Sequence, residues 1–162
     1  MSRLFLLDGY NLLFSFTSSN HPLATQRSEI IRLFQKECSL SKIEGALVFD
    51  GRVQRGEESG RNYHAPLEVI YTPKGSTADT YILELIEFSK SPNQLIVVSN
   101  DRTLLTKARS LGAQTMTNAE FLRKLLRPHK KTEKEKPSII ESKHNIERLL
   151  HIFEKKLREE DL

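Results

Sequence analysis

Short apolar runs that end in an aspartate are the feature that most constrains the fold of this chain. Residues 4–7 run directly into Asp8-Gly9, and residues 45–49 run into Asp50-Gly51. A short run that is apolar throughout predicts a strand buried on both faces of a parallel sheet, since a strand with one solvated face would alternate polar and apolar residues. Further strands are predicted at 67–72, 94–101 and 113–116.

The segments between these strands show the spacing of amphipathic helices. Helices are predicted at 10–14, 24–38, 77–89, 102–111 and 119–126, with Gly112 ending the fourth and Asn118 capping the last. The polar, glycine-rich stretch 52–66 shows no periodicity and is predicted to be an exposed loop. Strands that alternate with helices predict parallel pairing through right-handed crossovers. The expected fold is therefore an α/β fold, a three-layer α/β/α sandwich with a mostly parallel central sheet.

The length of 162 residues suits one such domain with a short appendage. We expect the domain to occupy residues 1–127 and a charged linker, rich in lysine and glutamate, to follow at 128–138. Residues 139–162 predict a C-terminal amphipathic helix. That helix must bury its apolar stripe on its own domain, on a second copy of the chain in a homo-oligomer, or on another partner. The stripe consists of Ile146, Leu149, Leu150, Phe153 and Leu157.

Composition excludes several classes of protein. No apolar run approaches the roughly 20 residues of a membrane span, so no membrane partner is expected. The single cysteine, Cys38, excludes a disulfide framework and a cysteine zinc site, and it favours a cytoplasmic protein. The start of the chain lacks the features of a signal peptide. The net charge of +4 is mild, but residues 123–136 are strongly basic, which suits either phosphate attraction or a solvated linker.

Four aspartates are expected to meet at one edge of this sheet. Asp8, Asp50 and Asp101 close predicted strands, and Asp79 lies in the first turn of the helix after the strand at 67–72. Ligands of open α/β sheets bind at the carboxyl ends of the strands. Carboxylates held together repel one another, and sets of oxygen ligands favour Mg²⁺ or Mn²⁺. The pattern therefore predicts a metal site formed by all four aspartates and the metal-assisted hydrolysis of phosphodiesters.

Each of these polar residues also has a purely structural interpretation. An aspartate at the end of a strand often caps the next helix or turn, and Asp50-Gly51 is also an ordinary turn pair. Asn11 fits a local turn as well as a role in orienting a metal-bound water or a phosphate. Ser99 and Asn100 fit the cap of the following helix as well as the lining of the site. The five histidines show no ligand spacing and are treated as surface residues.

The first motif of the chain resembles that of a known family. Residues 8–13, Asp-Gly-Tyr-Asn-Leu-Leu, follow the first predicted strand and are similar to the opening motif of NYN domains, which are PIN-like ribonucleases. Motifs at 48–51, 69–79, 97–102 and 119–122 follow in the order seen in the bacterial YacP-like branch. The resemblance covers residues 2–127. It implies a PIN-like fold and a metal-dependent endoribonuclease that cleaves single-stranded RNA, with the ribosome or a translated mRNA as a further partner.

The resemblance also implies roles for particular residues. Carried over by position, Asp8, Asn11, Asp79 and Asp101 are the catalytic residues, and the three acids among them match the family's metal-binding positions. Thr80 and Thr103 depart from the pattern, because family members often have further acids at these two positions. Without these two acids, the metal site would have fewer carboxylate ligands. A non-catalytic RNA- or ribosome-binding module of the same fold is therefore the second hypothesis.

Basic and aromatic residues near this edge are the candidates for RNA contact. The stretch 52–66 carries arginines that can bind phosphates and a tyrosine that can stack on a base, although a plain solvated loop has the same composition. Lys74 and Arg102 are near the acids in sequence and are the better candidates for phosphate contact. The predicted RNA-binding set is Arg52, Arg55, Arg61, Tyr63, Lys74 and Arg102. A small-molecule phosphatase is disfavoured, because Tyr10 stands where that class needs a second aspartate.

Overall fold

The sheet of this protein is six-stranded, and five of its strands are parallel. The structure is a computed structural model that describes residues 3–16, 21–51, 61–64 and 66–126. The strand order is β3-β4-β2-β1-β5-β6, and only the edge strand β3 runs antiparallel to its neighbour. The strands are β1 (Leu4–Asp8), β2 (Glu44–Phe49), β3 (Arg61–His64), β4 (Leu67–Tyr71), β5 (Leu95–Val98) and β6 (Gln114–Met116).

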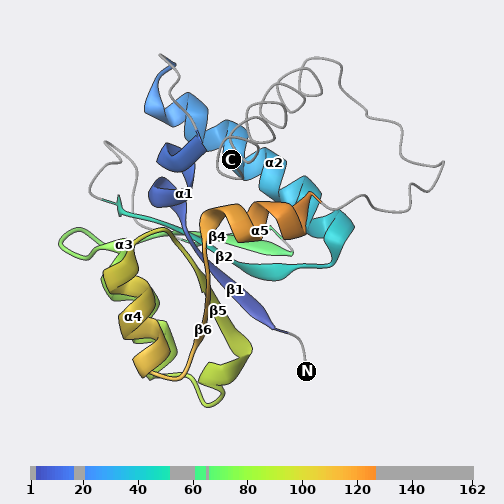
Figure 1. Cartoon of the computed structure of the whole chain (residues 1–162). Helices are drawn as coiled ribbons and strands as arrows, with labels where there is room; N and C mark the ends of the chain where they lie inside the picture. The colour runs from blue at the N-terminus through green and yellow to red at the C-terminus, as the bar shows by residue number, and fades with distance from the viewer. Residues whose placement is uncertain (1–2, 17–20, 52–60, 65, 127–162) are drawn as a thin grey trace.

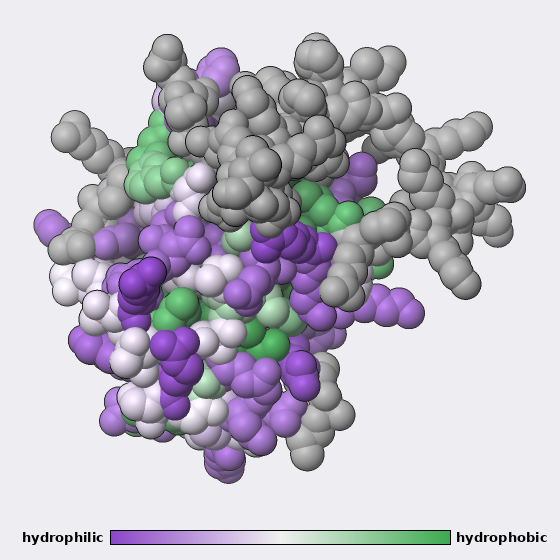
Figure 2. All heavy atoms as spheres, in the orientation of Figure 1, coloured by the Kyte–Doolittle hydropathy of each residue, from purple (hydrophilic) through white to green (hydrophobic). Residues whose placement is uncertain are grey.

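Helices cover both faces of the sheet, which confirms the predicted three-layer sandwich. One face carries α1 (Gly9–Phe16), α2 (Leu23–Ser41) and α5 (Asn118–Leu125), and the other carries α3 (Ala78–Glu87) and α4 (Arg102–Ser110), as Figure 1 shows. No helix within the described ranges is long and apolar enough to cross a membrane. Hydrophilic residues dominate the coloured surface on the face in view, and hydrophobic ones form small separate patches (Figure 2).

Two apolar cores, one on each face of the sheet, explain why the central strands are apolar at every position. In β1, Phe5 and Leu7 enter the core under α1, α2 and α5, whereas Leu6 enters the core under α3 and α4. In β2, Leu47 faces the first core and Val48 the second. Successive side chains of a strand point to opposite faces. Burying one such leucine stabilises the fold by roughly 1.5–3 kcal/mol, so a polar residue at any of these positions would be costly.

The order of the strands creates a topological switch point at the carboxyl ends of β1 and β5, where consecutive connections leave the sheet in opposite directions. From β1 the chain moves to β2 and β4 on one side, and after β4 it crosses back to β5 on the other side of β1. The connections after β1 and β5 therefore pass to opposite faces of the sheet, with α1 on one face and α4 on the other. Such a switch point is where ligands of open α/β sheets bind.

Three expectations about the secondary structure need correction or stay open. Residues 61–64 form the edge strand β3 and are not part of a loop. Their backbone pairs with β4, and the sequence pattern of these four residues does not predict this long-range pairing. The last core helix is capped by Thr117, whose hydroxyl accepts the Glu120 N–H, and not by Asn118. The predicted linker at 128–138 and the C-terminal helix at 139–162 lie outside the described residues.

Gly45 provides a test of the packing between β1 and β2. A Cβ atom at this position would lie 2.1 Å from the Phe5 carbonyl oxygen, which is backbone and cannot move aside cheaply. We expect Gly45→Ala to lower the free energy of unfolding by roughly 1–3 kcal/mol. Urea unfolding followed by circular dichroism measures the change, with the exposed Glu44→Ala on the same strand as the control. Equal stability of the two variants would contradict the close approach.

Candidate active site

Asp8 is the central acid of the site, because it ends the strand next to the switch point. Its side chain is 7% exposed, and its Oδ2 accepts a hydrogen bond of 3.0 Å from the Ser99 hydroxyl. The Asn11 N–H also donates to it, so Asp8 caps α1. The pKa of Asp8 is raised to about 7, mainly by burial and also by the charges of Asp79 and Asp101, while the hydrogen bonds from Ser99 and Asn11 lower it. Desolvation therefore outweighs the polar contacts around this carboxylate.

Ser99 and Asp101 lie on the connection that follows β5. The Ser99 side chain is fully buried, and its oxygen accepts the Asp101 N–H at 3.1 Å while its hydrogen points to Asp8. Asp101 caps α4, since its Oδ1 accepts the N–H groups of Thr103 and Leu104 at 3.0 and 3.3 Å. One hydroxyl thus ties the carboxylate at the end of β1 to the backbone that presents the carboxylate after β5.

Asp79 joins the acids from the β4 side of the sheet, because it lies on the helix that follows β4. It lies in the first turn of α3, whose N-cap is Thr77. Burial raises the pKa of Asp79, and the charge of Asp101 and a hydrogen bond with its side chain raise it further, whereas Lys107 lowers it. Asp50 acts on Asp79 more weakly in the raising direction. All four predicted acids therefore share one electrostatic neighbourhood, with Asp50 at its margin.

The four acids do not form a finished metal cage. In the part of the chain that the structure describes, no three His, Cys, Asp or Glu side chains are arranged as a group that could hold a metal ion. The predicted ligands are brought to one edge, but the coordination shell is incomplete. Mg²⁺ is commonly bound in this manner, through one or two carboxylates, with waters and substrate phosphates filling the remaining positions.

Asn11 belongs to a polar junction rather than to the acid group alone. Its Oδ1 accepts the Asn100 N–H at 2.9 Å and the Asn118 Nδ2 at 3.0 Å. Asn118 is fully buried, donates further to the Ser15 hydroxyl at 2.8 Å, and keeps its own Oδ1 without a partner among the described residues. These bonds tie α1 to α5 and to the loop after β5. The structure thus shows Asn11 joining separate elements, a role that differs from both the local turn and the orienting of a water or phosphate that the sequence suggested.

Two glycines allow the connections to pass close to the neighbouring strands. A Cβ on Gly9 would lie 2.6 Å from the Phe49 ring and 2.8 Å from the Val48 carbonyl oxygen, so a side chain there would push α1 away from β2. Gly51 lies against Thr72 in the same way, and its N–H donates to the Thr72 hydroxyl at 3.0 Å. The two Asp-Gly pairs therefore combine an acid of the candidate site with a position that tolerates no larger residue.

Thr80 and Thr103, which depart from the family pattern, have exposed side chains. The Thr80 N–H and hydroxyl both bond to the hydroxyl of the cap residue Thr77, at 3.1 and 3.0 Å. The Thr103 N–H donates to Asp101. Each threonine therefore contributes to a helix cap, and neither supplies a carboxylate to the site.

The predicted RNA-binding residues divide into three groups. Lys74 lies exposed in the turn after β4, and Arg102 is the exposed first residue of α4, so both belong to the carboxyl edge. In β3, the backbone of Arg61 pairs with Ile70 near the carboxyl end of β4, whereas Tyr63 pairs with Glu68, further from that edge. Arg52 and Arg55 lie outside the described residues.

Sequence reasoning did not foresee the contacts that three residues make near the acids. Lys107 influences Asp79 from the second turn of α4, Asn118 joins the junction from α5, and Thr72 supports the turn after β2. Helical periodicity alone does not reveal which neighbouring element a lysine faces. The polar residue at the start of α5 was noticed, but it was interpreted as a cap.

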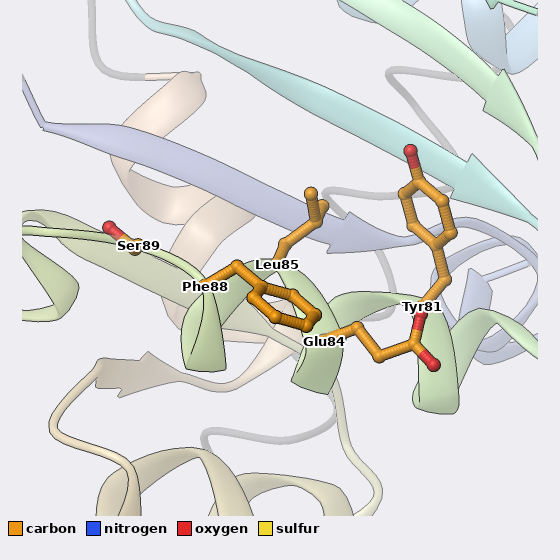
Figure 3. A pocket seen from close by; sticks show the side chains of 5 residues that line it. All are labelled: Tyr81, Glu84, Leu85, Phe88 and Ser89. Carbon is orange, nitrogen blue, oxygen red and sulfur yellow. The ribbon is translucent and has the colours of Figure 1, made fainter.

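The surface hollow of about 300 Å³ on α3 is not the active site. It is lined by Tyr81, Glu84, Leu85, Phe88 and Ser89, whose side chains are shown in Figure 3. None of the predicted site residues lines it. The chemistry is instead concentrated at the carboxyl edge, where carboxylates influence one another's pKa values.

The fold and the edge cluster together define an α/β domain with an acidic site at the carboxyl ends of its parallel strands. Residues 5–161 match the family model of the YacP-like NYN domain. This chain belongs to the YacP-like NYN domain family, which confirms the resemblance noted in its motifs. The fold is therefore of the RNase-like kind.

Solved structures show the same fold. The crystal structure of Rae1 (YacP) from Bacillus subtilis, in a tryptophan-to-leucine mutant form, matches with a TM-score of 0.61 at 21% identity, over 99% of this chain and 97% of that one. A second crystal structure of Rae1 (YacP) from Bacillus subtilis matches with a TM-score of 0.59 at 21% identity, over 98% of this chain and 83% of that one. The comparison with curated proteins finds no match.

Asp8 makes the stability of the protein depend on pH. Its pKa is about 7 in the folded state and 3.8 as a free carboxyl, so the folded state binds the proton more tightly, and stability falls as pH rises from about 4 to 7. We expect Asp8→Asn to be more stable than wild type, by a margin that grows by roughly 1–3 kcal/mol between pH 5 and pH 7.5. Urea unfolding in the presence of a chelator measures this margin. A margin that is independent of pH would contradict the burial of an ionisable Asp8.

Proposed function

We propose that this chain is a metal-dependent endoribonuclease that cleaves single-stranded RNA at the carboxyl ends of β1 and β5. One observation carries the proposal. Asp8, Asp79 and Asp101 come from three separate elements, yet the charges of Asp79 and Asp101 raise the pKa of Asp8, and the charge of Asp101 raises the pKa of Asp79. Structural capping alone does not require three acids to face one another, since each cap would be satisfied at a different place on the surface. Such clusters of perturbed acids mark functional sites.

The donor chemistry of the cluster suits a divalent cation. The proposed ligands are Asp8, Asp79 and Asp101, with Asp50 nearby, and all of them offer the oxygen atoms that Mg²⁺ and Mn²⁺ prefer. The raised pKa of Asp8 supports this choice, because a nearby positive charge would favour the ionised form that burial and the neighbouring acids disfavour. When bound, such an ion neutralises charge on the phosphodiester and acidifies an attacking water.

The protein's own residues would hold and orient the reactants. Ser99 fixes Asp8 relative to the backbone of Asp101, so the two carboxylates keep their separation when RNA arrives. The Oδ1 of Asp101 is held by the N–H groups of α4, which orients this carboxylate toward the edge. Lys74 and Arg102 stand exposed on the same edge and are suited to contact phosphates flanking the cleaved bond.

The setting of the activity is part of the same proposal. We propose a translated mRNA or the ribosome as a partner, since the motifs of this chain resemble those of a family with such members. We also propose a cytoplasmic location, where the buried Cys38 thiol stays reduced. Supplied RNA of any single-stranded sequence is sufficient to test the chemistry itself.

A non-catalytic RNA-binding module is the second candidate. It is favoured by the exposed hydroxyls of Thr80 and Thr103, which replace acids, and by the incomplete cage in the described part of the chain. Retention of RNA on a filter without cleavage under any divalent metal would support it. Turnover of RNA would exclude it.

Cleavage assays with isosteric variants test the proposal directly. We expect Asp8→Asn, Asp79→Asn and Asp101→Asn each to reduce Mn²⁺-dependent cleavage of single-stranded RNA by about 100-fold or more, since a direct ligand matters at least as much as a supporting residue. Asparagine at 101 still accepts the N–H groups of α4, so the helix cap survives. Glu87→Gln, an exposed acid on α3, is the matched control. Full activity in the Asp8→Asn, Asp101→Asn double variant would refute the assignment.

Metal binding has a readout that does not depend on cleavage. We expect millimolar Mn²⁺ or Mg²⁺ to raise the melting temperature of wild type by a few degrees at pH 7.5, because a ligand that binds only the folded state stabilises it. The rise should be smaller at pH 5, where Asp8 carries a proton, and it should be largely absent in Asp79→Asn. Equal shifts in wild type and in this variant would place the ion elsewhere.

A further inference from the structure

Four aromatic side chains form a row beside the acidic edge, on the side of the sheet covered by α1. Tyr10 and Phe14 belong to α1, and Phe49 and Tyr71 end β2 and β4. The Tyr10 and Phe14 rings stack with centroids 5.7 Å apart and planes 18° apart. Tyr10 meets Phe49 edge-on at 4.9 Å, and Phe49 stacks on Tyr71 at 5.7 Å. This aromatic row therefore runs from β4 across β2 to α1.

The inner part of the aromatic row is held in place by Arg27 of α2. The Arg27 guanidinium lies 5.5 Å from the centroid of the Tyr71 ring, and its Nη1 donates to the Tyr10 hydroxyl at 3.0 Å. Both Arg27 and Tyr10 are 8% exposed. A buried cation over one ring and a hydrogen bond to another restrict how the row can move. Phe14 therefore rests on a rigid support.

The outer end of the row faces solvent. Phe14 is 59% exposed, although its ring stacks on Tyr10. Three other large apolar residues are exposed in the described part of the chain, and they lie where β1 begins or where α3 and α4 end. These places belong to the opposite edge of the sheet. They are Leu4, Phe88 and Leu111. Among the four exposed large apolar side chains of the described residues, Phe14 is thus the one on the helix that begins at the acidic edge.

We propose that Phe14 is a stacking site for an unpaired nucleobase of an RNA whose backbone crosses the acids. The inference rests on the proposed function and adds to it a place for the base. Phe14 follows Gly9 by five residues of helix, so it lies about 8 Å further along the axis, a separation of nucleotide size. Aromatic platforms bind bases without sequence preference because every base has a π face.

A nucleobase fits this position better than a protein partner. Protein interfaces need contiguous apolar patches of several hundred Å². Phe14 offers a single ring, supported from behind by a parallel ring, and its row lies beside Asp8 and Asp50 in sequence. A flat ligand that carries a phosphate to the acids matches both features. The expected contribution is on the order of tenfold in RNA affinity.

The absence of tryptophan from the chain provides a direct probe. Phe14→Trp introduces the single indole of the protein, and Phe88→Trp does the same at the exposed end of α3 as the matched control. We titrate each variant with a 12-residue oligoadenylate, with a chelator present so that no cleavage occurs. The expected result is saturable quenching for Phe14→Trp and none for Phe88→Trp. Inorganic polyphosphate of matched charge should quench neither, because it has no bases.

Kinetics provide a second measurement. Phe14→Leu keeps an apolar side chain but removes the π face, so we expect KM for the oligoadenylate to rise about tenfold while kcat changes less than about twofold. Phe14→Trp should retain the wild-type KM, and Phe88→Leu should be unaffected. Circular dichroism confirms that each variant is folded.

The outcomes separate this inference from the proposed function. Cleavage by wild type, combined with an unchanged KM in Phe14→Leu or with equal quenching by polyphosphate, overturns the stacking site and leaves the nuclease intact. Selective quenching without any cleavage overturns the nuclease but supports the stacking site. A change of oligomeric state in Phe14→Leu, seen by sedimentation, would instead assign Phe14 to an interface between copies and overturn the inference.

Discussion

The buried carboxylate of Asp8, beside two further acids, governs how the surrounding residues must be arranged. Asp8 ends the central strand, and desolvation together with the charges of Asp79 and Asp101 makes its ionised form costly. A fold that served stability alone would have no reason to keep this arrangement, because a neutral residue would avoid the repulsion. The surrounding polar contacts and the proposed cation are best understood as compensation for that cost.

Hydrogen bonds between elements that are far apart in the sequence offset part of the cost of burying Asp8. Ser99 lies 91 residues after Asp8 in the sequence, and its hydroxyl links the Asp8 carboxylate to the backbone N–H of Asp101. Asn11 and Asn118 tie α1 to α5 at the same edge. Both connections exist because the strand order places β5 directly beside β1. The switch point thus brings the residues of the site together, and the hydrogen bonds fix the positions of their side chains.

Helix capping and acid chemistry are not alternatives in this protein. Asp101 caps α4 through Oδ1, and Asp8 caps α1, yet both face the same group of carboxylates. A cap orients a carboxylate, and the proposed metal site would need oriented carboxylates, so one interaction would serve both purposes. Thr80 and Thr103 both take part in helix caps without supplying a carboxylate, so these caps do not depend on an acid at either position.

The layers of the fold and the edge where the acids gather follow from the pattern of residues along the chain. Strands that are apolar throughout, such as 4–7, admit only a sheet covered on both faces, and parallel strands bring their terminal aspartates together. Contacts between separate elements, in contrast, became visible only in three dimensions. They are the pairing of β3 with β4, the junction around Asn118, the influence of Lys107 on Asp79 and the aromatic row behind Phe14. Periodicity records which face of an element is buried, whereas these contacts depend on how separate elements are placed in space.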